Sequence, residues 1–182
     1  MTEASLTKCL ARLSSVSAGT WEILGISDFS GTLEDAVRRH DPKKPAGAVY
    51  FNFGELRLIA MMLLDPGDIE CISKCFMGYS FPRGPVTTQT EEVMLLELGN
   101  IILNALTNSA LNALKKSVMP PVPAYLEGDL NRLLEGVGAG VALKNNFRII
   151  AASLAIKSDR SVARSEVLVL VPCELAREIE PA

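Results

Sequence analysis

Apolar residues recur at two spacings along this chain, every third or fourth residue in some segments and every second residue in others. The first spacing is typical of a helix that buries one face, and the second of a strand that buries one face. The chain therefore mixes predicted helices and strands. We expect helices at about Ser5–Ser17, Leu33–Arg38, Asp65–Met77, Thr90–Ser117, Asp129–Leu134 and Pro172–Ile179, and strands at about Trp21–Ile26, Ala48–Phe53, Leu56–Leu64, Val122–Leu126, Val137–Lys144, Phe147–Ile156 and Ser165–Val171.

Capping residues support two of these helix starts. Asp65 can accept hydrogen bonds from a first turn that opens with Pro66. Thr88 and Glu91 have the spacing of a capping box in front of the long helix. The remaining stretch 27–45 is polar and rich in turn residues, so we predict a loop there, apart from the helical turn already named.

The two halves of the chain repeat one order of elements: a helix, a short strand, then a hairpin whose second strand runs into a helix. Met61–Pro66 and Val167–Pro172 match in apolar character and in their final proline. We therefore predict a single domain, residues 1–182, built from two weakly repeated halves of about 1–80 and 88–182. The expected fold class is α/β, of the α+β type, with an antiparallel sheet formed by strands from both halves and long helices covering one face.

Composition narrows the possible functions. The formal net charge is −3 and no basic block is present, so we expect neither a nucleic-acid partner nor an anionic membrane partner. No uninterrupted apolar run reaches the ~18 residues of a membrane span. The first eight residues are polar rather than signal-like, which favours a cytoplasmic protein with free thiols.

The chain offers few candidates for a metal or a histidine-based site. Cys71 and Cys75 share a helical face, but no histidine or second cysteine pair completes a metal site around them. His40 is the only histidine, and its charged and proline-rich surroundings indicate a solvated loop residue. We therefore expect no cofactor and no metal on this chain.

The long helix carries a polar stripe in an apolar background. Glu97, Asn100, Asn104, Asn108 and Asn112 follow one another at steps of three or four residues. Each asparagine costs about 0.5 kcal/mol of helix propensity relative to alanine, and a glycine about 1 kcal/mol. The last three asparagines are expected to bond neighbouring helices or face water. Glu97 and Asn100 are the candidate functional pair.

A resemblance to a known family rests on this helix. The segment Glu97–Ala105 (ELGNIILNA), followed by Leu111–Leu114 (LNAL) and then by Pro121, resembles the active-site helix of the CheC/CheX/FliY phosphatases of bacterial chemotaxis. That family's motif is Asp or Ser, three residues, Glu, two residues, Asn, and a proline about 22 positions on. Here Val93 stands at the first position. The first helix lacks a second Glu-x-x-Asn, so the arrangement resembles that of CheX, with a single motif.

The resemblance implies a function, a partner and roles for both residues. The reaction would be hydrolysis of a phosphoaspartate on a CheY-like response regulator, which would bring its own Mg²⁺. Asn100 would orient the attacking water, and Glu97 would pair with the lysine beside the regulator's phosphorylation site. A homodimer is a further expectation.

Two other functions stay open beside this one. A non-catalytic interaction or scaffold domain, similar to the middle domain of the flagellar switch protein FliM, is the alternative. A small-molecule enzyme has less support, because the chain has no glycine-rich phosphate loop, catalytic triad or metal-ligand set.

Overall fold

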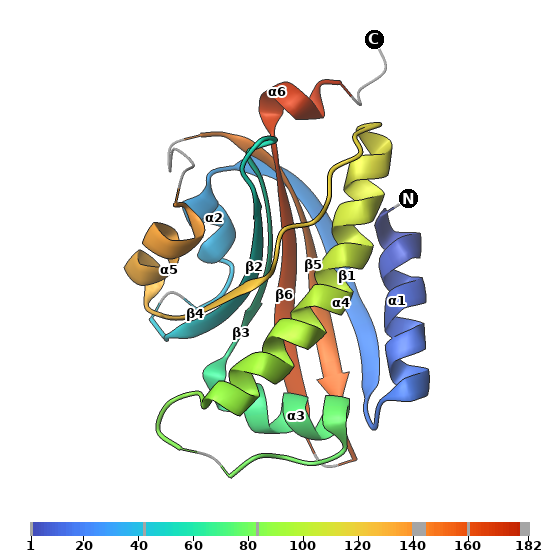
Figure 1. Cartoon of the computed structure of the whole chain (residues 1–182), viewed down its shortest axis with the longest axis vertical. Helices are drawn as coiled ribbons and strands as arrows, with labels where there is room; N and C mark the ends of the chain where they lie inside the picture. Colours follow the sequence, from blue (N-terminus) through green and yellow to red (C-terminus); the bar gives the residue numbers. More distant parts are fainter. Residues whose placement is uncertain (1, 42, 83, 140–144, 160, 179–182) are drawn as a thin grey trace.

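The computed structural model describes residues 2–41, 43–82, 84–139, 145–159 and 161–178. Within these residues, a six-stranded antiparallel sheet has helices on both of its faces (Figure 1). The strands are β1 (Thr20–Gly31), β2 (Ala46–Phe53), β3 (Leu58–Leu64), β4 (Ala124–Gly128), β5 (Phe147–Lys157) and β6 (Val162–Pro172). The helices are α1 (Thr2–Val16), α2 (Leu33–Val37), a short 3-10 turn η1 (Pro66–Asp68), α3 (Ile69–Met77), α4 (Gln89–Ala113), α5 (Leu130–Val137) and α6 (Cys173–Ala176).

The strand order is symmetric about the centre of the sheet. Across the sheet the strands follow the order β1-β5-β6-β3-β2-β4. If β1 is exchanged with β4, β2 with β5 and β3 with β6, the same order is obtained in reverse. At the centre, β3 pairs antiparallel with β6, and Met61 lies opposite Leu168. Strands from the first and the second part of the chain therefore pair antiparallel within one sheet, as the sequence predicts.

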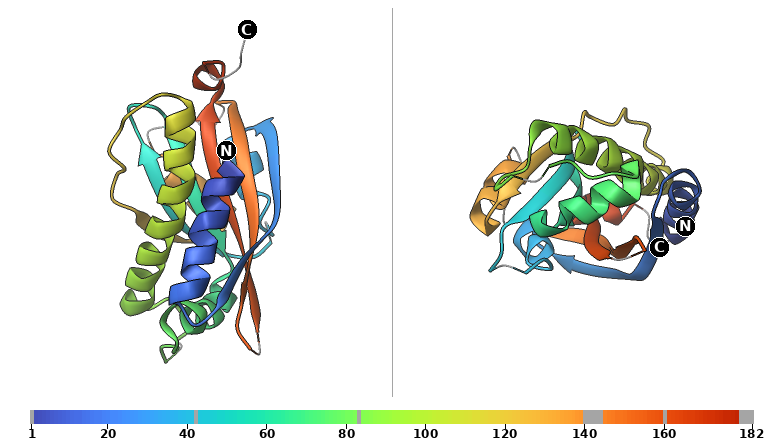
Figure 2. Two further views of the ribbon diagram at one scale, coloured as in Figure 1. Left: turned by 90° about the vertical axis from the view of Figure 1, so that its right-hand side faces the viewer. Right: turned by 90° about the horizontal axis from the view of Figure 1, so that it is seen from below.

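The sheet separates two hydrophobic layers. All seven residues of β3 are buried, and their side chains alternate between the layers. The larger layer lies under α1, α3 and α4, and the smaller one under α2 and α5 (Figure 2). Coverage of one face by the long helices is thus confirmed, and the two short helices cover the other face.

The first strand is longer than the sequence predicts. We expected a loop from residue 27 onwards, but β1 continues to Gly31 and pairs with β5 along its whole length. Phe29 packs into the smaller layer, and the side chain of Asp28 forms an ion pair with Arg148 at 2.9 Å. This end of the strand has loop-like composition because β1 lies at the edge of the sheet, where one side of the strand is not paired within the described residues.

Three further expectations need correction or lie outside the described residues. Val137 was predicted to begin a strand, but it ends α5, because it completes the buried face that Leu133 begins. The rest of that predicted strand falls mostly on residues 140–144, outside the described residues. Helix α4 ends at Ala113 rather than near Ser117, and Lys115 then adopts a left-handed backbone conformation, with φ of 53°. The predicted end of the last helix, Ile179, also lies outside the described residues.

Helix α4 is long and apolar enough to cross a membrane by length and composition alone. In the fold, however, 56% of its most apolar 18-residue window is buried against the rest of the protein. This burial is typical of the central helix of a globular core, which is the position that α4 occupies on the sheet (Figure 1).

Candidate functional site

The candidate pair lies on α4, whose start is fixed by a capping box. The hydroxyl and the backbone N–H of Thr88 both donate to the Glu91 carboxylate, at 2.8 Å each. The backbone N–H of Glu91 donates in return to the Thr88 hydroxyl. These reciprocal bonds satisfy donors that a helix start would otherwise leave unpaired, so they fix where the first turn begins.

Gly99 allows α4 to lie very close to the sheet. A Cβ atom at this position would be 2.4 Å from Cγ1 of Val49 on β2 and 2.8 Å from its Cβ. No side chain fits in that space. Gly99 therefore serves helix–sheet packing, which accounts for a residue that is unfavourable for the helix on its own. The next residue, Asn100, is rotated by about 100° around the helix from that contact and is partly exposed.

The polar stripe is accessible along the helix. Glu97 is exposed, and Asn100 and Asn104 are each partly exposed. Leu103 and Leu114 are buried, as expected, and Leu96 is partly buried against the same core. A site made by Glu97 and Asn100 would therefore be open to a large partner. The structure brings the two side chains onto one face of one helix, one turn apart.

Asn104 bonds directly to the candidate residue Asn100. Its side-chain Nδ2 donates to Oδ1 of Asn100 at 2.8 Å. The Asn104 Oδ1 atom is itself buried and has no hydrogen-bond partner within the described residues. From its position in the sequence, Asn104 was expected only to bond neighbouring helices or to face water. The structure gives it a link to the candidate pair that the spacing did not reveal.

Val93 lies one helical turn before Glu97, on the same exposed face. Its side chain is 60% exposed, which is high for an apolar residue on a helix that otherwise buries its apolar side chains. This is the position where the resembling family has Asp or Ser. The apolar character of this end of the stripe therefore cannot be attributed to a role in the core.

Helix α1 runs beside α4 in the opposite direction (Figures 1 and 2). Cys9 on α1 donates its thiol to the backbone carbonyl of Ile101 on α4, at 3.8 Å. Burial raises the pKa of the Cys9 thiol. The two helices are equivalent in the repeated architecture, but only α4 carries the Glu-x-x-Asn motif.

The cysteines and the histidine lie elsewhere. Within the described residues, no group of three or more His, Cys, Asp or Glu side chains is placed to hold a metal ion. All four cysteines are free, and burial raises the pKa of Cys75 to about 12. His40 is only partly exposed, and its Nε2 is buried without a partner in the described part of the chain. It is thus less solvated than its neighbours in the sequence suggested.

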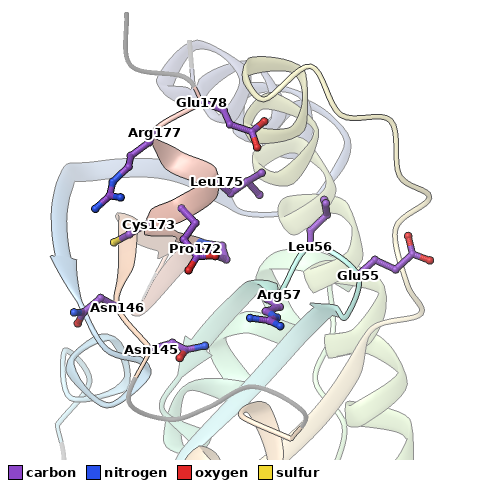
Figure 3. A pocket seen from close by; sticks show the side chains of 11 residues that line it. Glu55, Leu56, Arg57, Asn145, Asn146, Pro172, Cys173, Leu175, Arg177 and Glu178 are labelled. Carbon is purple, nitrogen blue, oxygen red and sulfur yellow. The ribbon is translucent and has the colours of Figure 1, made fainter. Parts of the chain in front are cut away.

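A pocket of about 620 Å³ opens at one end of the sheet, between the β2–β3 turn and α6 (Figure 3). Arg57 lines it and has a left-handed backbone conformation, with φ of 51°, which costs a non-glycine residue about 1 kcal/mol. Three glutamates and two arginines line the same pocket, so its charge favours no single class of ligand. None of the residues of the polar stripe lines it.

By sequence, the chain matches no protein-family model and no curated protein. Several solved structures nevertheless share its fold. FliY from Thermotoga maritima superposes with a TM-score of 0.62 at 10% identity, over 98% of this chain and 88% of its own. The FliM middle domain from Vibrio alginolyticus gives 0.59 at 16% identity, over 99% and 98%. A chain of the CheX–CheY–BeF₃–Mg²⁺ complex from Borrelia burgdorferi gives 0.56 at 12% identity, over 94% and 95%.

At these identities the comparisons establish the fold alone. This chain has the fold of FliY, CheX and the FliM middle domain, which is the fold implied by its long helix. The same fold therefore occurs in a protein crystallised with CheY and in a middle domain of a flagellar protein, so the fold by itself does not choose between the two functions considered above.

Proposed function

We propose that this protein, which has the fold of CheX, FliY and the FliM middle domain, hydrolyses the phosphoaspartate of a CheY-like response regulator. The observation that carries the proposal is the placement of Glu97 and Asn100 on one accessible face of α4, with the Asn100 amide held by Asn104. The CheX–CheY complex supports the class of partner, because it is a CheY complex formed by a protein of this fold.

The proposed reaction requires little covalent chemistry from the side chains of this protein. A water attacks phosphorus, the bond from phosphorus to the aspartyl oxygen breaks, and the products are a carboxylate and inorganic phosphate. A Mg²⁺ held by the regulator's own carboxylates would supply charge neutralisation at the phosphoryl group. What remains for the phosphatase is to hold the water in line with the leaving oxygen.

Asn100 is suited to hold that water. A side-chain amide has two donor hydrogens and an oxygen with two lone pairs. The bond from Asn104 occupies one lone pair of Oδ1, so the second lone pair can accept a hydrogen bond from the attacking water. Because the amide is already oriented before the partner binds, less conformational freedom is lost in the transition state.

Glu97 is suited to a different task. Its carboxylate is exposed one turn before Asn100, where it can form an ion pair with a lysine of the regulator. Such a pair fixes the position of α4 on its partner without entering the reaction. We therefore assign docking to Glu97 and water positioning to Asn100.

The direct test is to incubate the 182-residue chain with a panel of phosphorylated receiver domains from the same organism, with Mg²⁺, and to follow phosphate release. Faster release than spontaneous hydrolysis for one receiver, lost in Asn100→Ala, is the expected result. If no receiver is hydrolysed faster than in buffer, the chain is not a phosphatase of this class.

A non-catalytic scaffold is the second candidate, and Val93 is the observation that favours it. An exposed valine stands where the resembling phosphatases have Asp or Ser, and the FliM middle domain has the same fold. A scaffold would bind a partner protein without turning it over. Binding of a receiver with no increase in phosphate release would assign the chain to this class.

A further inference from the structure

A second surface feature adjoins the candidate site. A groove of about 570 Å³ lies between α1 and α4, with a mainly apolar lining. Leu13 and Val16 of α1 and Ile101 of α4 contribute to this lining. Val16 is 75% exposed, so the groove opens widely to solvent at that end.

The groove is continuous with the face that carries the candidate pair. Ile101 lines the groove and is four residues after Glu97, so the two side chains are neighbours on adjacent turns of α4. The contact between Cys9 and Ile101 aligns the two antiparallel helices. With a rise of about 1.5 Å per residue, Arg12 on α1 then lies near the level of Glu97.

The charge of the groove differs from the charge of the chain. Lys8 and Arg12 line it, four residues apart on one side of α1, and none of the residues that line it is acidic. The chain as a whole has a formal net charge of −3. The groove is therefore a local cationic surface with an apolar floor, next to an exposed site on α4.

We propose that this groove docks the phosphorylated receiver domain beside its phosphoaspartate, so that α1 and α4 together form the binding surface. The inference rests on the proposed function. A receiver presents a phosphoryl group and the carboxylates that hold its Mg²⁺, so the surface around its site is acidic and complements Lys8 and Arg12. An apolar side chain of the receiver next to that acidic rim enters the floor formed by Leu13, Val16 and Ile101.

Other polyanionic partners fit this groove less well. Nucleic acids and anionic membranes are typically bound through clusters of four or more cationic side chains. Two cations beside an apolar floor are instead typical of a protein–protein contact, in which charge steers association and apolar contact adds affinity.

The test reverses both charges in the 182-residue chain. Lys8→Glu with Arg12→Glu is compared with Lys43→Glu with Lys44→Glu, a control pair that makes the same change in net charge on the exposed connection between α2 and β2. For a receiver that the wild type hydrolyses, we expect KM to rise about tenfold at low ionic strength, with kcat unchanged. The increase should shrink in 1 M salt, where the screening length is about 3 Å. The control pair should change KM less than twofold.

Two outcomes would overturn the proposal that this groove docks the receiver domain. One is an unchanged KM in the α1 double variant, and the other is an equal rise in the control pair, which would show a response to net charge alone. Both leave the phosphatase proposal intact.

A binding measurement distinguishes failure of the proposed phosphatase activity from failure of the proposed docking groove. If the wild type binds a receiver activated with beryllofluoride but hydrolyses none, the same two double variants are compared by Kd instead of KM. A higher Kd in the α1 variant alone then supports docking in the groove and rejects the phosphatase activity. A wild type that binds no receiver in either assay overturns both proposals.

Discussion

Asn104 donates a hydrogen bond from its Nδ2 to Oδ1 of Asn100, at 2.8 Å, within one turn of α4. The bond links a partly buried amide to the amide that we propose acts on water. Because of this bond, Asn104 cannot serve as a neutral control position on the stripe. Asn108, one turn further on and exposed, serves that purpose.

Replacement of Asn104 by alanine should slow phosphate release about tenfold through kcat, with KM unchanged. The reason is that Asn100 loses the donor that fixes its amide. The free energy of unfolding should change little, since a lost hydrogen bond of about 1 kcal/mol is opposed by a propensity gain of about 0.5 kcal/mol. Asn104→Asp should be equally slow, because a carboxylate cannot donate to Oδ1. Asn108→Ala should match the wild type, and a rate loss there as large as at Asn104 would contradict the role.

Replacement of Asn100 and Glu97 should give different kinetic signatures. Asn100→Ala should lower kcat about 100-fold, as removal of one oriented polar group does elsewhere. Glu97→Gln keeps the shape and removes the charge, so we expect a higher KM with little change in kcat. Steady-state measurements with one receiver separate the two. If Glu97→Gln instead lowers kcat as strongly as Asn100→Ala, Glu97 acts in the chemical step rather than in docking.

Gly99→Ala should destabilise the protein even though alanine is the better helix former. The new Cβ would lie 2.4 Å from Cγ1 of Val49. Overpacking in a core costs about 1–3 kcal/mol, which exceeds the propensity gain of about 1 kcal/mol. Urea unfolding measures the difference. Combining Gly99→Ala with Val49→Ala should cost less than the sum of the two single changes. A single variant as stable as the wild type would mean that α4 can move away from β2.

Cys75 should be the slowest of the four thiols to react with iodoacetamide in the folded protein. It is fully buried, and its pKa is raised to about 12 by burial and by the neighbouring Cys71. At pH 8 only about one thiolate in ten thousand would then be present, and the thiolate is the reactive form. Mass spectrometry of partially alkylated protein ranks the sites. Equal labelling of Cys71 and Cys75 before unfolding would contradict the burial of Cys75.

Self-association stays a prediction. Strand β1 lies at one edge of the sheet, and Leu24, at an irregularity of its pairing with β5, is 51% exposed. Such edges are surfaces on which strands of another chain can pair. At tens of micromolar, light scattering should give about twice the chain mass of 19.6 kDa. Leu24→Lys should lower that mass, and a wild type that is monomeric under these conditions would refute the dimer.

The elements that the sequence predicts well are those with local signals. The start of α4 follows from Thr88 and Glu91, which are three residues apart and bond each other without help from the rest of the fold. The second half of β1 could not be predicted in this way. Asp28 and its neighbours are polar, and they are extended because β5, about 120 residues later, pairs with them. Val137 was misplaced for a similar reason, since its environment is the buried face of α5.

In the candidate site, too, features set by local sequence could be predicted, and features set by contacts between distant segments could not. The spacing of Glu97 and Asn100 is enough to place them on one face of a helix, because that geometry is set by the helix alone. The reason for Gly99 lies in Val49, fifty residues earlier, and the groove beside the site requires α1 to pack against α4. Both depend on contacts between distant segments, which no pattern in the sequence of α4 contains.

The alternation of strands from the two halves has a consequence for how the chain reaches its native state. Because β5 and β6 lie between β1 and the β2–β3 hairpin, the first half cannot close its own sheet. A ribosome must therefore release most of the chain before β1 finds its partner, and until then apolar strands remain uncovered and open to chaperones or aggregation. Two separately expressed fragments, cut near residue 80, would be expected to fold only when mixed, each serving as the template for the other.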